Sequence, residues 1–133
     1  MLEIKSIQSK DEQKNICEKC GVEFIPDALA YDAKEHSSKE NGVLLGVSQF
    51  RILGEYAVIY TLSNAIGIND TDALVIIGKT TLNFIDLCGV HDVVTHIKNT
   101  RLLELLEFKH DESDGLYRLN LTGYFDSPCQ RRE

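Results

Sequence analysis

The chain has 133 residues, with a hydrophobic fraction of 43%, a charged fraction of 26% and a formal net charge of −7, which together fit a globular protein of one domain. The acidic balance argues against nucleic acid or an anionic membrane surface as the partner, because no basic surplus exists to displace counterions. No apolar run approaches the roughly 20 residues that cross a bilayer, and the charged N-terminus does not resemble a signal peptide, so we expect a cytosolic protein with its four cysteines reduced.

The first part of the chain predicts one strand and one helix. Residues 2–8 alternate weakly between apolar and polar side chains, as a strand does. Ser9 can cap a helix over 9–20, because an acidic first turn follows it and a glycine ends it. Cys17 and Cys20 share one face of this helix. Because no further ligands stand at metal-site spacing, we interpret both as packed thiols and expect no metal site.

Three strand patterns follow without a helix between them, over 28–34, 42–53 and 55–62. Apolar side chains alternate along the third pattern from Tyr56 to Leu62. Short polar links join the three segments, so we predict an antiparallel meander.

Residues 71–90, TDALVIIGKTTLNFIDLCGV, have two interpretations. The letters ALVII followed by Gly-Lys-Thr could form a strand that leads into a phosphate-binding loop, but the first glycine that such a loop needs is replaced by Ala73. A helix fits better, because Asp70 or Thr71 can cap it and apolar residues recur at helical spacing. We therefore predict a buried helix over 71–88, followed by a strand that lies parallel to the last meander strand.

The C-terminal part predicts a short strand over 92–97 and a leucine-rich helix over 100–107. A final hairpin follows, formed by 108–112 and 116–121 around a Ser-Asp-Gly turn. Residues 122–133 are expected to form a tail of the same domain. The predicted order is β-α-β-β-β-α-β-α-β-β.

This order resembles the GNAT superfamily of acyl-CoA-dependent N-acetyltransferases. Residues 40–52, ENGVLLGVSQFRI, resemble the G-x-L-x-G-x-x-x-F pattern of its second and third strands. Residues 78–93, GKTTLNFIDLCGVHDV, resemble the second half of its cofactor helix and the next strand, and 101–112, RLLELLEFKHDE, resemble a segment that usually ends in Leu-Gly-Phe. The resemblance covers about residues 28–121. It implies an α/β (α+β) fold with a mixed, mostly antiparallel twisted sheet and helices on both faces.

The resemblance also implies a function, the transfer of an acetyl group from acetyl-CoA to a small-molecule or peptide amine by direct attack. In the family the donor lies where two parallel strands splay apart, and its pyrophosphate accepts N–H groups at the start of the central helix. Carried over to this chain, the resemblance places the cofactor contacts at the strand end and around the helix start: Leu62, Ser63, Asn64, Ile77, Gly78 and Lys79. Glu55 is the candidate general base, and Tyr124 is the tyrosine that could reach the site as an acid.

The chain departs from the family pattern at several positions. The family's phosphate motif, [QR]-x-x-G-x-[GA], aligned over 73–78, matches only at Gly78. Leu103 stands where the family usually has a tyrosine, Glu107 stands where it has a glycine, and one helix instead of two precedes the meander. These departures leave a second interpretation open, a GNAT fold without catalysis that acts as a binding or interaction module. The sequence is compatible with a homodimer.

Overall fold

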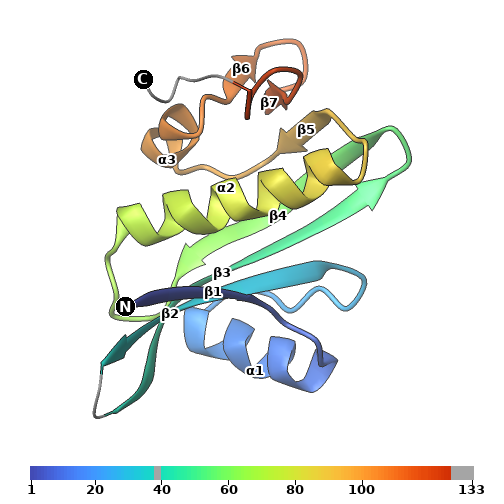
Figure 1. Cartoon of the computed structure of the whole chain (residues 1–133). Coiled ribbons are helices and arrows are strands. Elements are labelled where there is room, and N and C mark those ends of the chain that lie inside the picture. Colours follow the sequence, from blue (N-terminus) through green and yellow to red (C-terminus); the bar gives the residue numbers. More distant parts are fainter. Residues whose placement is uncertain (38–39, 127–133) are drawn as a thin grey trace.

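The computed structural model of the chain describes residues 1–37 and 40–126 (Figure 1). Its elements follow the predicted order throughout: β1 (Leu2–Ser6), α1 (Lys10–Cys20), β2 (Leu29–Ser37), β3 (Glu40–Leu53), β4 (Tyr56–Asn64), α2 (Thr71–Leu87), β5 (Asp92–Thr95), α3 (Thr100–Leu105), β6 (Lys109–Asp111) and β7 (Leu116–Asn120).

The seven strands form one mixed sheet in the order β1-β2-β3-β4-β5-β7-β6. Strands β4 and β5 pair in parallel, and every other neighbouring pair is antiparallel. The predicted meander and the predicted parallel strand are therefore confirmed. The parallel pair requires a crossover between its strands, and α2 provides it.

The 71–90 segment is a helix, as the capping and the spacing of apolar residues predict. Asp70 is the N-cap of α2, and its carboxylate accepts a hydrogen bond from the Ala73 backbone N–H at 3.0 Å. One side of the helix is fully buried against the sheet, whereas Ile76 is 42% exposed on the opposite side. Because residues 73–77 are helical, a strand with a phosphate loop after it is excluded. Burial of the apolar side offsets the weak helix propensity of the β-branched residues.

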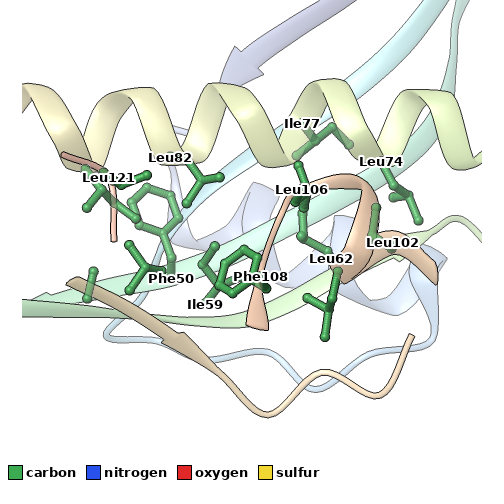
Figure 2. Packing of buried hydrophobic residues seen from close by; sticks show 14 of the residues in the cluster. Phe50, Ile59, Leu62, Leu74, Ile77, Leu82, Leu102, Leu106, Phe108 and Leu121 are labelled. Atoms are coloured by element: carbon green, nitrogen blue, oxygen red, sulfur yellow. The ribbon is translucent and has the colours of Figure 1, made fainter. Parts of the chain in front are cut away.

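Helices cover both faces of the sheet, which confirms the predicted architecture (Figure 1). On one face, Ser48 of β3 hydrogen-bonds Thr81 of α2 at 2.9 Å. The next residue along β3, Val47, points to the other face and packs against Ile16 and Cys20 of α1. Figure 2 shows the main core, in which apolar side chains of the sheet meet those of α2 and of the α3 region: Phe50, Ile59, Leu62, Leu74, Ile77, Leu82, Leu102, Leu106, Phe108 and Leu121.

Both cysteines of α1 are buried, and Cys20 belongs to the smaller core on the α1 face of the sheet. Cys17 is fully buried and Cys20 is 5% exposed, and both are free thiols. Burial raises the pKa of Cys17, and burial together with the nearby Cys17 and Asp32 raises the pKa of Cys20 to about 11. Both thiols are protonated at neutral pH, which agrees with their interpretation as packed side chains.

Asp32 of β2 is a buried carboxyl on the same face of the sheet. It lies opposite Val47 in the strand register and is 4% exposed. Burial raises its pKa, Lys34 and Lys5 lower it, and Glu12 and Glu3 raise it. The folded state therefore binds this proton more tightly than the unfolded state, and folding stability falls as pH rises from 3.8 through the folded-state pKa.

We expect Asp32→Asn to raise the free energy of unfolding at pH 7 by about 1 kcal/mol, because an amide replaces a buried carboxylate. At pH 3 the carboxyl is protonated in both states, so the difference should vanish. Urea denaturation across this pH range measures the effect, with the exposed Asp27→Asn as the matched control. A constant difference at all pH values would contradict the role of ionisation.

The C-terminal segment differs in part from the prediction of a tail. Residues 122–126 form turns, and Tyr124 packs against the main core. Its hydroxyl donates a hydrogen bond to the Leu106 carbonyl at 3.0 Å. Residues 122–126 are therefore part of the folded domain, and 127–133 lie outside the described residues.

Candidate functional site

The parallel pairing of β4 and β5 is short and ends abruptly. It runs from Tyr56 beside Asp92 to Ile59 beside Thr95, and β5 ends there. The Thr95 hydroxyl donates to the Ile59 carbonyl at 2.7 Å and accepts from the Ile97 N–H at 3.2 Å, which turns the chain out of the sheet. Strand β4 continues without β5 beside it. We call the space next to residues 60–64 of β4 the β4–β5 gap.

A β-bulge lies at the point where this gap opens. Gln49 of β3 is opposite Thr61, but the next residue, Phe50, is opposite Ile59, so Tyr60 is an extra residue in β4. A bulge bends its strand and increases the local twist. Strand β4 therefore bends where its parallel neighbour, β5, ends, and alternate backbone groups of 60–64 are directed into the gap.

A cavity of about 420 Å³ occupies the gap on the α1 side of the sheet. Its walls come from the end of β4, from the loop that follows α1, and from Ile97 in the segment after β5. The lining residues are Val22, Glu23, Ile25, Tyr60, Thr61, Leu62, Ser63 and Ile97. The bulky aliphatic residues 75–77 of α2 are not among them. The cavity is therefore not walled by the central helix, and its own walls are partly apolar.

The loop wall of this cavity is fixed to the sheet by one buried amide. Gln49 is fully buried, and its Oε1 accepts from Gln13 Nε2 at 2.9 Å and from the Ile25 N–H at 3.0 Å. Its Nε2 donates to the Glu23 carbonyl at 2.8 Å and to Thr61 Oγ1 at 3.1 Å. The same side chain thus holds the loop and the strand that face each other across the cavity.

The start of α2, where the family places its pyrophosphate, already holds carboxylates. Asp70 caps the helix, and Asp72 lies in its first turn. The Asn64 amide donates to the carbonyls of Asp70 and Leu45 and accepts from the Asp70 N–H at 3.2 Å, which closes the loop between β4 and α2. An incoming phosphate meets negative charge here in addition to the helix dipole that favours it.

The predicted cofactor residues divide into three groups. Leu62 and Ser63 line the gap cavity, and Asn64 lies at the end of the same strand. Ile77 and Gly78 lie well inside α2, so the prediction that they stand at the helix start is wrong; their N–H groups belong to the helix ladder. Lys79 is exposed on the outer side of α2 and lines neither cavity.

This misplacement has a clear cause. The motif aligned over 73–78 rests on Gly78 alone, whereas the capping residues place the helix start at 70–71. A phosphate motif in register with the helix start falls on residues that include Asp70. The capping pattern was the signal that could have corrected the register.

Glu55 and Tyr124 lie together in a second cavity, a wide groove of about 1310 Å³. This groove is bounded by the first residues of β4 and β5 and by the chain around the end of α3. Glu55 and Thr61 are separated by about six residues of extended chain, roughly 20 Å, so Glu55 is at the opposite end of β4 from the gap. A role for Glu55 as base stays a prediction for a substrate held in the groove.

The groove also contains the residue that replaces a family glycine. Glu107 follows the C-cap of α3 with φ of 73°, the left-handed conformation that usually selects glycine. This conformation costs a non-glycine residue about 1 kcal/mol. Tyr124, hydrogen-bonded nearby, has its pKa raised to about 12 by burial and by Glu107, so its hydroxyl remains protonated well above neutral pH.

Within residues 1–37 and 40–126, neither a metal-binding cluster nor a membrane-spanning helix is present. No group of three or more histidine, cysteine or acidic side chains there is arranged to hold a metal ion. No helix in residues 1–37 and 40–126 is long and apolar enough to cross a membrane.

Comparison with known proteins places this geometry in a known class of fold. No family model and no curated protein matches the chain. Among solved structures, the PaiA N-acetyltransferase of Thermoplasma acidophilum in complex with coenzyme A superposes with a TM-score of 0.70 at 11% identity, covering 90% of this chain and 99% of that one. The spermidine/spermine N-acetyltransferase SpeG of Vibrio cholerae gives 0.67 at 10% identity, covering 95% and 98%. A GNAT-family protein of Desulfovibrio desulfuricans, described as a putative acetyltransferase, gives 0.66 at 12% identity, covering 91% and 99%. The chain has the GNAT fold.

Proposed function

We propose that the protein is an N-acetyltransferase that moves an acetyl group from acetyl-CoA to a small-molecule or peptide amine. The observation that carries the proposal is the β4–β5 gap: a parallel pair that parts at a bulge, beside a cavity lined by Leu62 and Ser63. The solved structures with the same fold include an acetyltransferase in complex with coenzyme A. The cytosolic location predicted from the sequence remains part of this proposal.

The residues of the gap fit the pantetheine arm of acetyl-CoA. The free edge of 60–64 offers backbone N–H and C=O groups to an extended ligand in the way that a missing strand would use them. Leu62 and Ile97 supply apolar walls that exclude water from the arm. When bound, acetyl-CoA supplies an activated thioester, and the chain's part is to hold the acceptor amine against it.

The start of α2 fits the pyrophosphate of acetyl-CoA less well than the gap fits its pantetheine arm. This difference favours a second candidate function. Asp70 and Asp72 put two carboxylates where the family's pyrophosphate binds, and Asn64 closes the loop there. A GNAT-fold binding module without catalysis has no need of that phosphate site. The second candidate is therefore a non-catalytic interaction module.

Binding of acetyl-CoA separates the two candidates. We expect isothermal calorimetry to show binding by the wild type, and a double variant, Asp70→Asn with Asp72→Asn, to bind about tenfold more tightly because two charges near the phosphates are removed. Asparagine also caps helices well, so the fold is preserved. The matched control is Asp11→Asn with Glu12→Gln, in the first turn of α1.

The outcomes are distinct. Binding by the wild type together with transfer to an amine supports the enzyme. If the double variant binds acetyl-CoA and the wild type does not, the result supports an interaction module that no longer binds acetyl-CoA. No heat from either protein up to millimolar acetyl-CoA contradicts the enzyme.

A further inference from the structure

We propose that Glu23 is the carboxylate that receives the acceptor amine in the β4–β5 gap and removes its proton. The inference rests on the proposed acetyl transfer and assigns a residue that the family resemblance did not indicate. Of the cavity's lining residues, Glu23 alone carries a charge at neutral pH; Tyr60 is a phenol, and the others are neutral. An ammonium group that enters this cavity therefore meets one carboxylate among its walls.

The backbone around Glu23 is held in place from both sides. The Glu23 carbonyl accepts from Gln49, and the Ile25 N–H donates to the same amide, so both ends of this short segment are bound to β3. Gln13 of α1 adds a hydrogen bond to the Ile25 carbonyl at 3.1 Å. The Glu23 side chain itself is exposed and appears in no hydrogen bond or ion pair of the described residues. The backbone of Glu23 is therefore fixed, while its carboxylate is available to the ammonium group of a ligand.

The position opposite Glu23 is the bulge. Gln49 binds Thr61 with the same nitrogen that binds the Glu23 carbonyl, and Thr61 directly follows Tyr60. A thioester held along the free edge of β4 therefore lies across the cavity from Glu23. Glu55, the base suggested by the resemblance, is at the other end of the strand and lines the wide groove instead.

The acceptor enters as an ammonium ion, and the Glu23 carboxylate takes one proton, directly or through one water. The neutral nitrogen bonds to the thioester carbon, the carbon–sulfur bond breaks, and its electron pair leaves with sulfur. The second nitrogen proton passes to the thiolate, which gives an amide and a free thiol. Glu23 then releases its proton to solvent.

Steady-state kinetics with a panel of amines, comprising butylamine, spermidine and an alanine-initiated tripeptide, tests the assignment. We expect Glu23→Gln to lower kcat/KM for the amine about 100-fold and to leave the Kd of acetyl-CoA unchanged. The loss should shrink as pH approaches the pKa of the amine, because the nucleophile is then already neutral. The matched control is Glu18→Gln, on the exposed side of α1, and Glu55→Gln tests the competing base.

A second measurement does not depend on turnover. Titration of spermidine without acetyl-CoA, followed by NMR, should shift the amides of residues 22–25 and 60–63 in the wild type. In Glu23→Gln the apparent affinity for spermidine, obtained from these shifts, should be about tenfold lower.

Equal activity, pH profile and amine binding in wild type and Glu23→Gln would overturn the assignment, as would loss of activity in Glu55→Gln alone. Both results leave the proposed transfer standing. Failure of the wild type to acetylate any amine of the panel overturns the proposed function itself.

Discussion

Gln49→Met is expected to lower the free energy of unfolding by about 3 kcal/mol, because methionine keeps the length of the side chain and loses all four of its hydrogen bonds. The buried Ile25 N–H and the Gln13 amide lose their acceptor, and Thr61 and the Glu23 carbonyl lose a donor. Urea denaturation measures the global loss. In this variant the Ile25 amide should exchange its hydrogen faster than the amides of α2, because the loop opens locally more often than the helix.

Gln8→Met, at an exposed position, is the control and should change stability by less than about 0.5 kcal/mol. A loss below 1 kcal/mol in Gln49→Met would show that water replaces the amide readily. In that case the loop wall of the gap would not depend on this side chain.

Gly46→Ala is expected to lower stability by roughly 3 kcal/mol and to weaken acetyl-CoA binding. A Cβ atom at Gly46 would lie 2.7 Å from the Ser63 carbonyl oxygen and 3.1 Å from Leu74. The first of these neighbours is backbone, so it can move only if β4 moves with it. Ser63 lines the gap cavity, and its displacement changes the site.

Gly78→Ala is the matched comparison for this prediction. Its Cβ would lie 2.8 Å from Leu106 Cδ1, the end of a flexible side chain that can shift, and alanine gains about 1 kcal/mol of helix propensity over glycine. We expect a near-neutral change in thermal and urea unfolding. Equal losses in the two variants would contradict the distinction between backbone and side-chain contacts.

The order of elements was predictable because local patterns encode it. Asp70 as a cap and the spacing of buried residues identified α2 correctly, although ALVII also suits a strand. Each of those signals lies within one element. The choice between helix and strand was decided by capping and by burial of one side, and the structure shows both.

The site was predictable only in part, because its geometry depends on residues far apart in the chain. Leu62 and Ser63, named from the resemblance, line the gap cavity, and their contact with a cofactor stays a prediction. Glu23 was missed because its position depends on Gln49, 26 residues later in the sequence. The resemblance predicted that the two parallel strands part, but the sequence pattern extended β5 to residue 97 instead of 95, because its end depends on the contact of Thr95 with Ile59. Periodicity does not report contacts of this range.

The short parallel pairing has a mechanical consequence for the sheet. In the part of the chain that the structure describes, the sheet pairing between strands β1–β4 and strands β5–β7 is limited to the register from Tyr56–Asp92 to Ile59–Thr95. Bending along this narrow seam changes the separation of the two halves without breaking the pairing inside either, and α2, which spans both, limits the angle. We expect the width of the β4–β5 gap to change by bending at this pairing. A ligand bound in the gap should therefore reduce the motion of the two halves of the sheet relative to each other.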